Sequence, residues 1–149
     1  MSSLPSAQVL LLEKDYTNRA LFAEYLEQCG YGVFQLADER EVFESLESYR
    51  PDVLVMNLKM PAVDGFTIIE QVRAHALWRS LPVLILTGYT LAKYQRRAYN
   101  LGADAYLTKP MAPSVLSASI AQLVERKAAD TLTKEFSKKR CKSAGRLMA

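Results

Sequence analysis

Short apolar runs alternate along the chain with longer segments in which apolar residues recur every three or four positions. The apolar runs are predicted to be strands buried on both faces, over residues 9–13, 33–36, 52–57, 82–87 and 103–109. The periodic segments are predicted to be helices, over residues 17–29, 39–49, 65–75, 91–101 and 112–127. The pattern therefore indicates five strands, each followed by a helix.

Regular alternation of strands and helices is typical of one fold class. We expect an α/β protein with a five-stranded parallel sheet, doubly wound, with right-handed crossovers and helices on both faces. Functional residues of such sheets lie at the carboxyl ends of the strands. The polar residues at those predicted ends are Glu13, Lys14, Asp15, Asn57, Thr87 and Lys109.

Composition and charge divide the chain into two parts. The 149 residues are enough for one domain, and the net charge is +3. From Lys127 onward there are seven basic residues against two acidic ones, so the preceding 126 residues carry a net charge of −2. We predict a domain over residues 7–127 and a basic extension over residues 128–149, helical at its start and loose at its end. The extension either binds nucleic acid or an acidic surface, or is a solvated tail that binds nothing.

Several classes of protein are excluded as first interpretations. No apolar run is long enough to span a bilayer, and the amino-terminal residues do not resemble a secretory signal. Cys29 and Cys141 lie too far apart for a zinc module, and so few cysteines fit the reducing cytoplasm. The glycines form no dinucleotide-binding, P-loop or nucleophile-elbow motif. We expect a cytoplasmic protein without a cofactor.

Four segments taken together resemble a known family. They are VLLLEKDYTNR at residues 9–19, PDVLVMNLKMPAVDGF at 51–66, LPVLILTGYT at 81–90 and GADAYLTKPM at 102–111. In this order they resemble the receiver domain of two-component response regulators, over about residues 9–126. The resemblance implies the fold predicted above and a role in signal transduction.

The resemblance also implies roles for single positions. In the family, an acidic pair after the first strand and an aspartate after the third bind Mg²⁺, and that aspartate accepts a phosphoryl group from a histidine kinase. By the same resemblance, Thr87 occupies the switch hydroxyl position, Lys109 the position of the family's lysine, and Tyr106 that of the switch aromatic residue.

Two positions depart from the family pattern. Asn57 stands where the phosphoacceptor aspartate is expected, and Lys14 replaces the second acid of the pair, while Glu13 keeps the first. An amide is a poor nucleophile, and Mg²⁺ requires anionic oxygen ligands. We therefore predict a degenerate phosphorylation pocket, without metal or catalytic residue, formed by Glu13, Lys14, Asn57, Thr87 and Lys109. Lys14 and Lys109 are expected to neutralise Glu13 and Asp15, with Lys14 in place of the metal ion.

The favoured function is that of a phosphorylation-independent pseudo-receiver. It would act as a protein–protein interaction module in a two-component pathway or phosphorelay, with no effector domain within these residues. Its contacts, including a homodimer, would use a face around Tyr106, Tyr99 and Arg96, although these tyrosines are equally explained as packing residues. Two alternatives stay open: a receiver still regulated by a ligand or phosphoryl group in the degenerate pocket, and a nucleic-acid-associated regulator that uses the basic tail.

Overall fold

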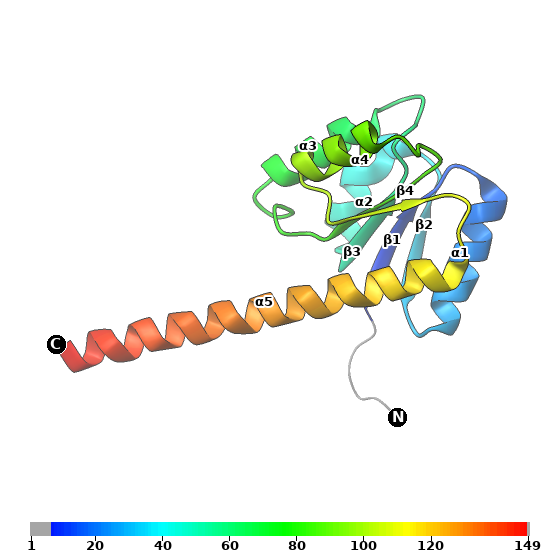
Figure 1. The fold of residues 1–149 in the computed structure, drawn as a ribbon. Helices are drawn as coiled ribbons and strands as arrows, with labels where there is room; N and C mark the ends of the chain where they lie inside the picture. The colour runs from blue at the N-terminus through cyan, green and yellow to red at the C-terminus, as the bar shows by residue number, and fades with distance from the viewer. Residues whose placement is uncertain (1–6, 149) are drawn as a thin grey trace.

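The computed structural model describes residues 7–148, and the side chains of residues 7–133. Five parallel strands form one sheet in the order β2-β1-β3-β4-β5 (Figure 1). Their bounds are β1 Gln8–Leu12, β2 Gly32–Leu36, β3 Val53–Met56, β4 Val83–Thr87 and β5 Ala105–Thr108. The predicted five-stranded, doubly wound α/β sheet is confirmed.

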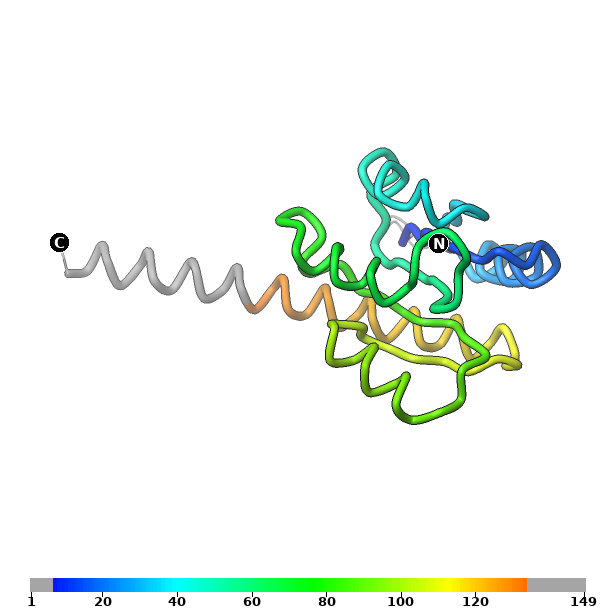
Figure 2. Tube along the Cα trace, turned by 90° about the horizontal axis from the view of Figure 1, so that it is seen from above, coloured from blue at the N-terminus to red at the C-terminus, as the bar shows by residue number. Residues whose placement is uncertain are grey.

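Helices cover both faces of the sheet (Figures 1 and 2). On one face lie α1 (Tyr16–Gln28) and α5 (Pro113–Met148), and on the other lie α2 (Val42–Tyr49), α3 (Gly65–Ala74) and α4 (Ala92–Leu101). This arrangement follows from the connections, because a parallel strand is reached only by a crossover that returns over one face.

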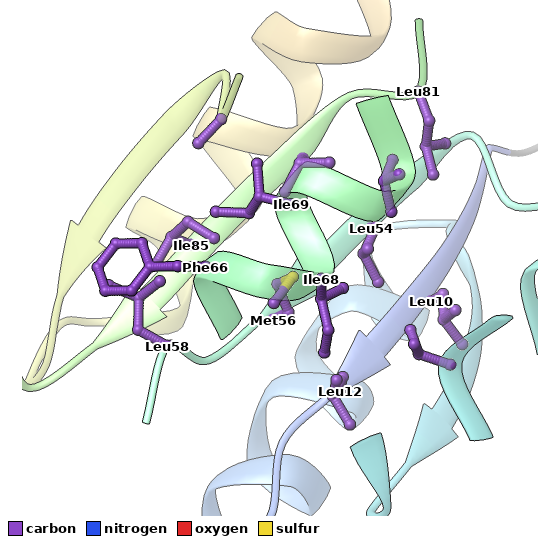
Figure 3. Packing of buried hydrophobic residues seen from close by; sticks show 14 of the residues in the cluster. Leu10, Leu12, Leu54, Met56, Leu58, Phe66, Ile68, Ile69, Leu81 and Ile85 are labelled. Carbon is purple, nitrogen blue, oxygen red and sulfur yellow. The ribbon is translucent and has the colours of Figure 1, made fainter. Parts of the chain in front are cut away.

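The central strands are apolar throughout because consecutive side chains enter two different cores. In β1, Val9 and Leu11 pack with α1 and α5, whereas Leu10 and Leu12 pack with α2 and α3. The strands β3 and β4 alternate in the same way. Figure 3 shows the core on the face covered by α2, α3 and α4, where Leu10, Leu12, Leu54 and Met56 pack with Ile68 and Ile69 of α3.

Two helices differ from the predicted bounds. The segment predicted as one helix over residues 39–49 begins with a 3₁₀ turn, η1 (Glu39–Glu41), before α2. Helix α5 runs to Met148, past residue 127 where the predicted helix ended. Helix α5 thus includes the start of the basic extension, which was predicted to be helical, and also its end to Met148, which was predicted to be loose. The side chains from residue 134 onward lie outside the described part. Despite the length of α5, no helix within residues 7–148 is apolar enough to cross a membrane.

The strand register places the polar strand ends together. Leu12 of β1 pairs with Met56 of β3, so the next residues, Glu13 and Asn57, leave the sheet side by side. Thr87 ends β4 opposite Thr108 of β5, the residue before Lys109. The four positions from different parts of the sequence therefore meet at one edge of the sheet.

Truncating the central core should be costly. Leu54 is fully buried in β3, so the exchange Leu54→Ala removes apolar contacts and leaves a cavity. We expect the free energy of unfolding to fall by about 2–5 kcal/mol in urea titrations. The control is Leu77→Ala, at a leucine that is 74% exposed, for which a change within about 0.5 kcal/mol is expected. Equal losses in both variants would contradict the assigned core.

Candidate functional site

The centre of the site is the buried carboxylate of Glu13. This residue has no exposed surface, and both of its carboxylate oxygens are engaged. Its Oε1 accepts a hydrogen bond from Nζ of Lys109, and its Oε2 accepts one from Nδ2 of Asn57. The backbone N–H of Glu13 donates to the carbonyl of Leu36 at 3.0 Å. Glu13 therefore links the ends of β1, β2, β3 and β5.

This arrangement leaves the centre electrically balanced. The negative charge of Glu13 is matched by the ammonium group of Lys109, and Asn57 contributes no charge. A buried carboxylate is tolerated only when it is paired and hydrogen-bonded, and here both conditions are met. The remaining oxygen of Asn57, Oδ1, is buried and has no hydrogen-bond partner among the described residues.

Asn57 is held in place by a close approach of α3. The N–H of Gly65, at the start of α3, donates to the carbonyl of Leu58 at 3.0 Å. A Cβ atom on Gly65 would lie 2.6 Å from the carbonyl oxygen of Asn57 and 2.7 Å from the Cα atom of Leu58. Only glycine allows this contact, so the Asp64-Gly65 pair fixes the backbone on which Asn57 sits.

Lys14 does not neutralise Glu13, which corrects the prediction. Its Nζ lies 2.7 Å from Oε2 of Glu39 and donates a weaker bond, at 3.3 Å, to the carbonyl of Ala37. Asp15 is also elsewhere, because its carboxylate caps α1 by accepting from the N–H of Asn18 at 2.8 Å. The cation beside Glu13 is therefore Lys109, whereas Lys14 has its own acidic partner.

Glu39 is the residue of the site that the sequence analysis missed. Its side chain is buried, with Oε2 bonded to Lys14 and Oε1 accepting from the N–H of Ala62 at 2.7 Å. Glu39 thus joins three loops at this edge of the sheet: β1–α1, β2–α2 and β3–α3. The sequence feature that could have identified Glu39 is an acidic residue shortly after a strand end. Glu39, however, lies three residues beyond Leu36 and falls within the helix predicted over residues 39–49.

The pKa of Glu39 reflects two opposing effects. Burial by itself raises the pKa of this carboxyl group. The hydrogen bond from Lys14, those from the N–H groups of Glu39 and Ala62, and the nearby charge of Lys14 together hold the pKa below its ordinary value. Glu39 is therefore ionised at neutral pH, and its charge depends on Lys14.

Thr87 and Tyr106 are tied to the β4–α4 loop. The hydroxyl oxygen of buried Thr87 accepts from the N–H of Tyr89 at 3.1 Å, and its carbonyl accepts from the N–H of Lys109 at 2.7 Å. The hydroxyl of Tyr106 donates to the carbonyl of Tyr89 at 2.8 Å. Burial of the hydroxyl group is the largest cause that raises the pKa of Tyr106, and electrostatic interactions with Tyr89 and Tyr94 raise it further. Thr87 therefore lies at the site, and its hydroxyl oxygen accepts a hydrogen bond from the β4–α4 loop.

The predicted interaction face lies on α4 and β5. Tyr99 is 42% exposed and its ring packs obliquely on that of Tyr106, with centroids 6.5 Å apart. Arg96 is exposed on the same helix. The rings of Tyr89 and Tyr94, from the β4–α4 loop and α4, stack with their centroids 4.6 Å apart. Tyr106 is half-buried, so packing and surface exposure are both present in this cluster.

The residues present do not fit the Mg²⁺ ion that the resemblance implies. Magnesium in proteins is held by carboxylates in octahedral geometry. Of the five residues of the predicted pocket, Glu13 alone carries a carboxylate, and both of its oxygens accept hydrogen bonds. Lys14 and Lys109 bring positive charge to the same edge. Among the described side chains, no cluster of three His, Cys, Asp or Glu could hold a metal ion.

Comparison with known proteins gives a consistent result. A model of the response regulator receiver domain family matches residues 9–121. The protein ycf29 of Porphyra purpurea is 30% identical over 134 residues, which cover 90% of this chain and 63% of the relative. The response regulator Rre1 of Synechocystis is 30% identical over 124 residues, which cover 83% of this chain and 54% of the relative. The chain thus spans less than two thirds of these relatives.

Solved structures show the same architecture. The chemotaxis response regulator CheY4 of Vibrio cholerae superposes with a TM-score of 0.74 at 28% identity, covering 79% of this chain and 98% of that one. The match covers nearly all of that chain, so the two chains share the receiver fold.

The ion pair between Lys14 and Glu39 should give a stability that depends on pH. We expect Lys14→Met to lower the free energy of unfolding at pH 7 by about 1–3 kcal/mol, less than for a fully buried pair because the Lys14 side chain is 36% exposed. Since the folded protein lowers the pKa of Glu39, the contribution is present above about pH 4.3 and is lost as the pH falls through the folded value.

Urea unfolding of both proteins between neutral and acid pH measures this difference. The gap between wild type and Lys14→Met should close in acid. Lys59→Met, at an exposed lysine without an ion-pair partner among the described residues, serves as the control. A gap that persists unchanged in acid would show that Glu39 is not the partner that matters.

Proposed function

Because the chain belongs to the response regulator receiver domain family, we propose that it is a receiver that transmits signals by protein contact without being phosphorylated. The observation that carries the proposal is the engagement of Glu13, the one acid retained from the family's acidic pair, by Lys109 and Asn57. The phosphoacceptor position holds an amide, and the two carboxylate oxygens that would face a metal are already bonded. The proposed setting is a two-component pathway in the cytoplasm.

The chemistry of the pocket supports this proposal in two ways. An amide does not form an acyl phosphate, which requires a carboxylate oxygen as nucleophile. The ammonium of Lys109, which would contact phosphoryl oxygens in the family, donates to Glu13, and the hydroxyl oxygen of Thr87 accepts from the N–H of Tyr89. Apart from Oδ1 of Asn57, these side chains thus have bonds within the protein, and we assign no residue a catalytic role.

A second candidate function is regulation by a ligand in this degenerate pocket. One observation favours it: Oδ1 of Asn57 is buried and accepts no hydrogen bond from the described residues. A buried polar atom without a partner costs free energy that a donor group would recover. If a ligand binds in the pocket, the amide NMR signals at Asn57 should shift when it is added, whereas the first proposal predicts no such shift.

The partner surface that we propose is formed by α4, β5 and α5. It offers the exposed ring of Tyr99, the half-buried ring of Tyr106 and the guanidinium of Arg96. Tyrosine and arginine are enriched where protein interfaces are buried. A second copy of this chain is the first partner to test, and a separate signalling protein is the other.

The pocket should ignore both the metal ion and the phosphoryl mimic. In an amide NMR titration with Mg²⁺, and then with Mg²⁺ and beryllofluoride, we expect no saturable shifts at Asn57, Thr87 or Lys109. The reason is that both carboxylate oxygens of Glu13 accept bonds within the protein, one of them from the ammonium of Lys109. Saturable shifts that spread to Tyr106 would contradict the proposal and favour the second candidate.

Restoring the two missing carboxylates provides the matched variant. The double exchange Lys14→Asp with Asn57→Asp should bind Mg²⁺ measurably in the same titration, because three carboxylates would then surround the site. Asn57→Asp alone, which keeps the ammonium of Lys14, should bind far more weakly. If the double variant still ignores Mg²⁺, these positions are not the equivalents of the family's acidic residues.

The partner surface can be tested by sedimentation equilibrium. If a second copy binds there, the combined exchange Tyr99→Ala and Arg96→Ala should weaken the dimer at least about tenfold, since interface anchors of these types cost more than about 1 kcal/mol each. Lys93→Ala, on an exposed side chain of α4, is the control. A wild-type chain that stays monomeric at its highest soluble concentration would exclude the second copy.

A further inference from the structure

A hollow with positively charged walls lies at the edge of the sheet opposite Asn57. It has a volume of about 270 Å³ and is formed between the loop from α3 to β4 and helix α5, whose coloured part runs from yellow to orange in Figure 2. Four of its lining side chains are basic and two are acidic: Arg73, Arg79, Arg126, Lys127, Asp104 and Asp130. We call this feature the basic hollow.

The back of the basic hollow is built by Arg73. Its guanidinium donates to the carbonyls of Leu81 at 2.6 Å and Gly102 at 2.9 Å, and it pairs with Asp104 at 2.8 Å. It also reaches the carbonyl of Arg79 at 3.3 Å. The guanidinium of Arg73 is therefore fully engaged by bonds within the protein, and it stabilises the loop that carries Arg79.

The other three cations of the hollow have no such partners. Among the residues that the structure describes, the side chains of Arg79, Arg126 and Lys127 form no ion pair and no hydrogen bond. Arg126 and Lys127 follow Leu123, which is buried against the sheet, so the start of this segment of α5 is anchored. Three unpaired positive charges thus surround one concave site on two supported elements.

Positive charge is not a general property of this domain. The first 126 residues contain 14 acidic residues against 12 basic ones, so the hollow is a local concentration of positive charge on a weakly acidic body. Such a concentration attracts anions over several ångströms before contact. Guanidinium groups in addition match the oxygens of phosphate in a two-point geometry.

We propose that the basic hollow binds phosphate groups of a nucleic acid backbone. The length of positively charged chain favours a polymer over a single small anion. Helix α5 continues from the hollow to Met148, and after Asp130 the sequence adds six basic residues against one acidic residue. A basic sequence that continues along one helix beyond the hollow suits an extended polyanion. The proposal is independent of whether the degenerate pocket accepts a ligand.

Binding of this kind has a characteristic dependence on salt. Each phosphate neutralised by a lysine or arginine releases bound counterions, so affinity falls steeply between about 50 and 200 mM salt and depends little on sequence. The probe is a fluorescently labelled 20-base-pair DNA duplex of arbitrary sequence, titrated with the full chain at several salt concentrations. We expect saturable binding with a steep salt slope.

The decisive variant removes two charges of the hollow, Arg79→Gln with Arg126→Gln. Both side chains are exposed, and circular dichroism verifies that the variant folds. We expect about a tenfold or larger loss of affinity near 100 mM salt and a salt slope shallower by about two. The matched control, Lys59→Gln with Lys93→Gln, removes the same charge at the carboxyl-end edge of the sheet and should keep nearly all of the affinity.

Three results would overturn the proposal. The first is an absence of binding by the wild type at low salt. The second is an equal loss in the hollow variant and the control, since net charge and not the hollow would then decide binding. The third is tighter binding to vesicles of phosphatidylserine and phosphatidylcholine than to DNA, with the same loss in the hollow variant, which would assign the hollow to an anionic membrane surface.

Discussion

The carboxylate of Glu13 determines how this edge of the molecule is organised. Placed in the apolar interior at the end of β1, it is stable only if its charge is matched and its oxygens accept hydrogen bonds. Lys109 supplies the charge and Asn57 the second bond. These two contacts join strand ends that lie 44 and 96 positions away in sequence. The charge of this centre is therefore balanced by the protein's own side chains, which supports our proposal of a receiver that acts without phosphorylation.

A second ion pair likewise balances a buried carboxylate, in the loops that follow β1, β2 and β3. Glu39 is buried beside the pocket, and it is kept ionised by Lys14 and by the N–H of Ala62. The lysine that replaces an acid of the family pattern thus stabilises another acid, and with it the relative positions of three loops. This connection between the loops is made by charged side chains of the folded protein, which supports our proposal of a receiver that acts without phosphorylation.

Much of the fold could be predicted because the central strands are buried on both faces. A run such as VLLL in β1 has no polar position, which is incompatible with a surface helix, and the helices between the strands show a clear apolar stripe. The predicted strand and helix bounds agree with the structure within two residues at most ends. The exceptions have local causes. The 3₁₀ turn η1, capped by Asp38, which accepts from the N–H of Arg40, precedes α2. Helix α5 continues beyond its last core contact, where apolar periodicity carries no information.

The chemistry of single positions was determined by the sequence, whereas their partners were decided by the tertiary structure. That Asn57 cannot act as a phosphoacceptor is a property of its amide group and needs no coordinates. That Lys14 pairs with Glu39 and not with Glu13 depends on how closely the loop after β2 approaches the loop after β1, across 25 positions of sequence. The basic hollow depends likewise on α5 crossing the start of β4 beside Arg79. Residue identity fixes which charges and bonds a side chain can offer, but packing alone decides which other side chain lies within a few ångströms to receive them.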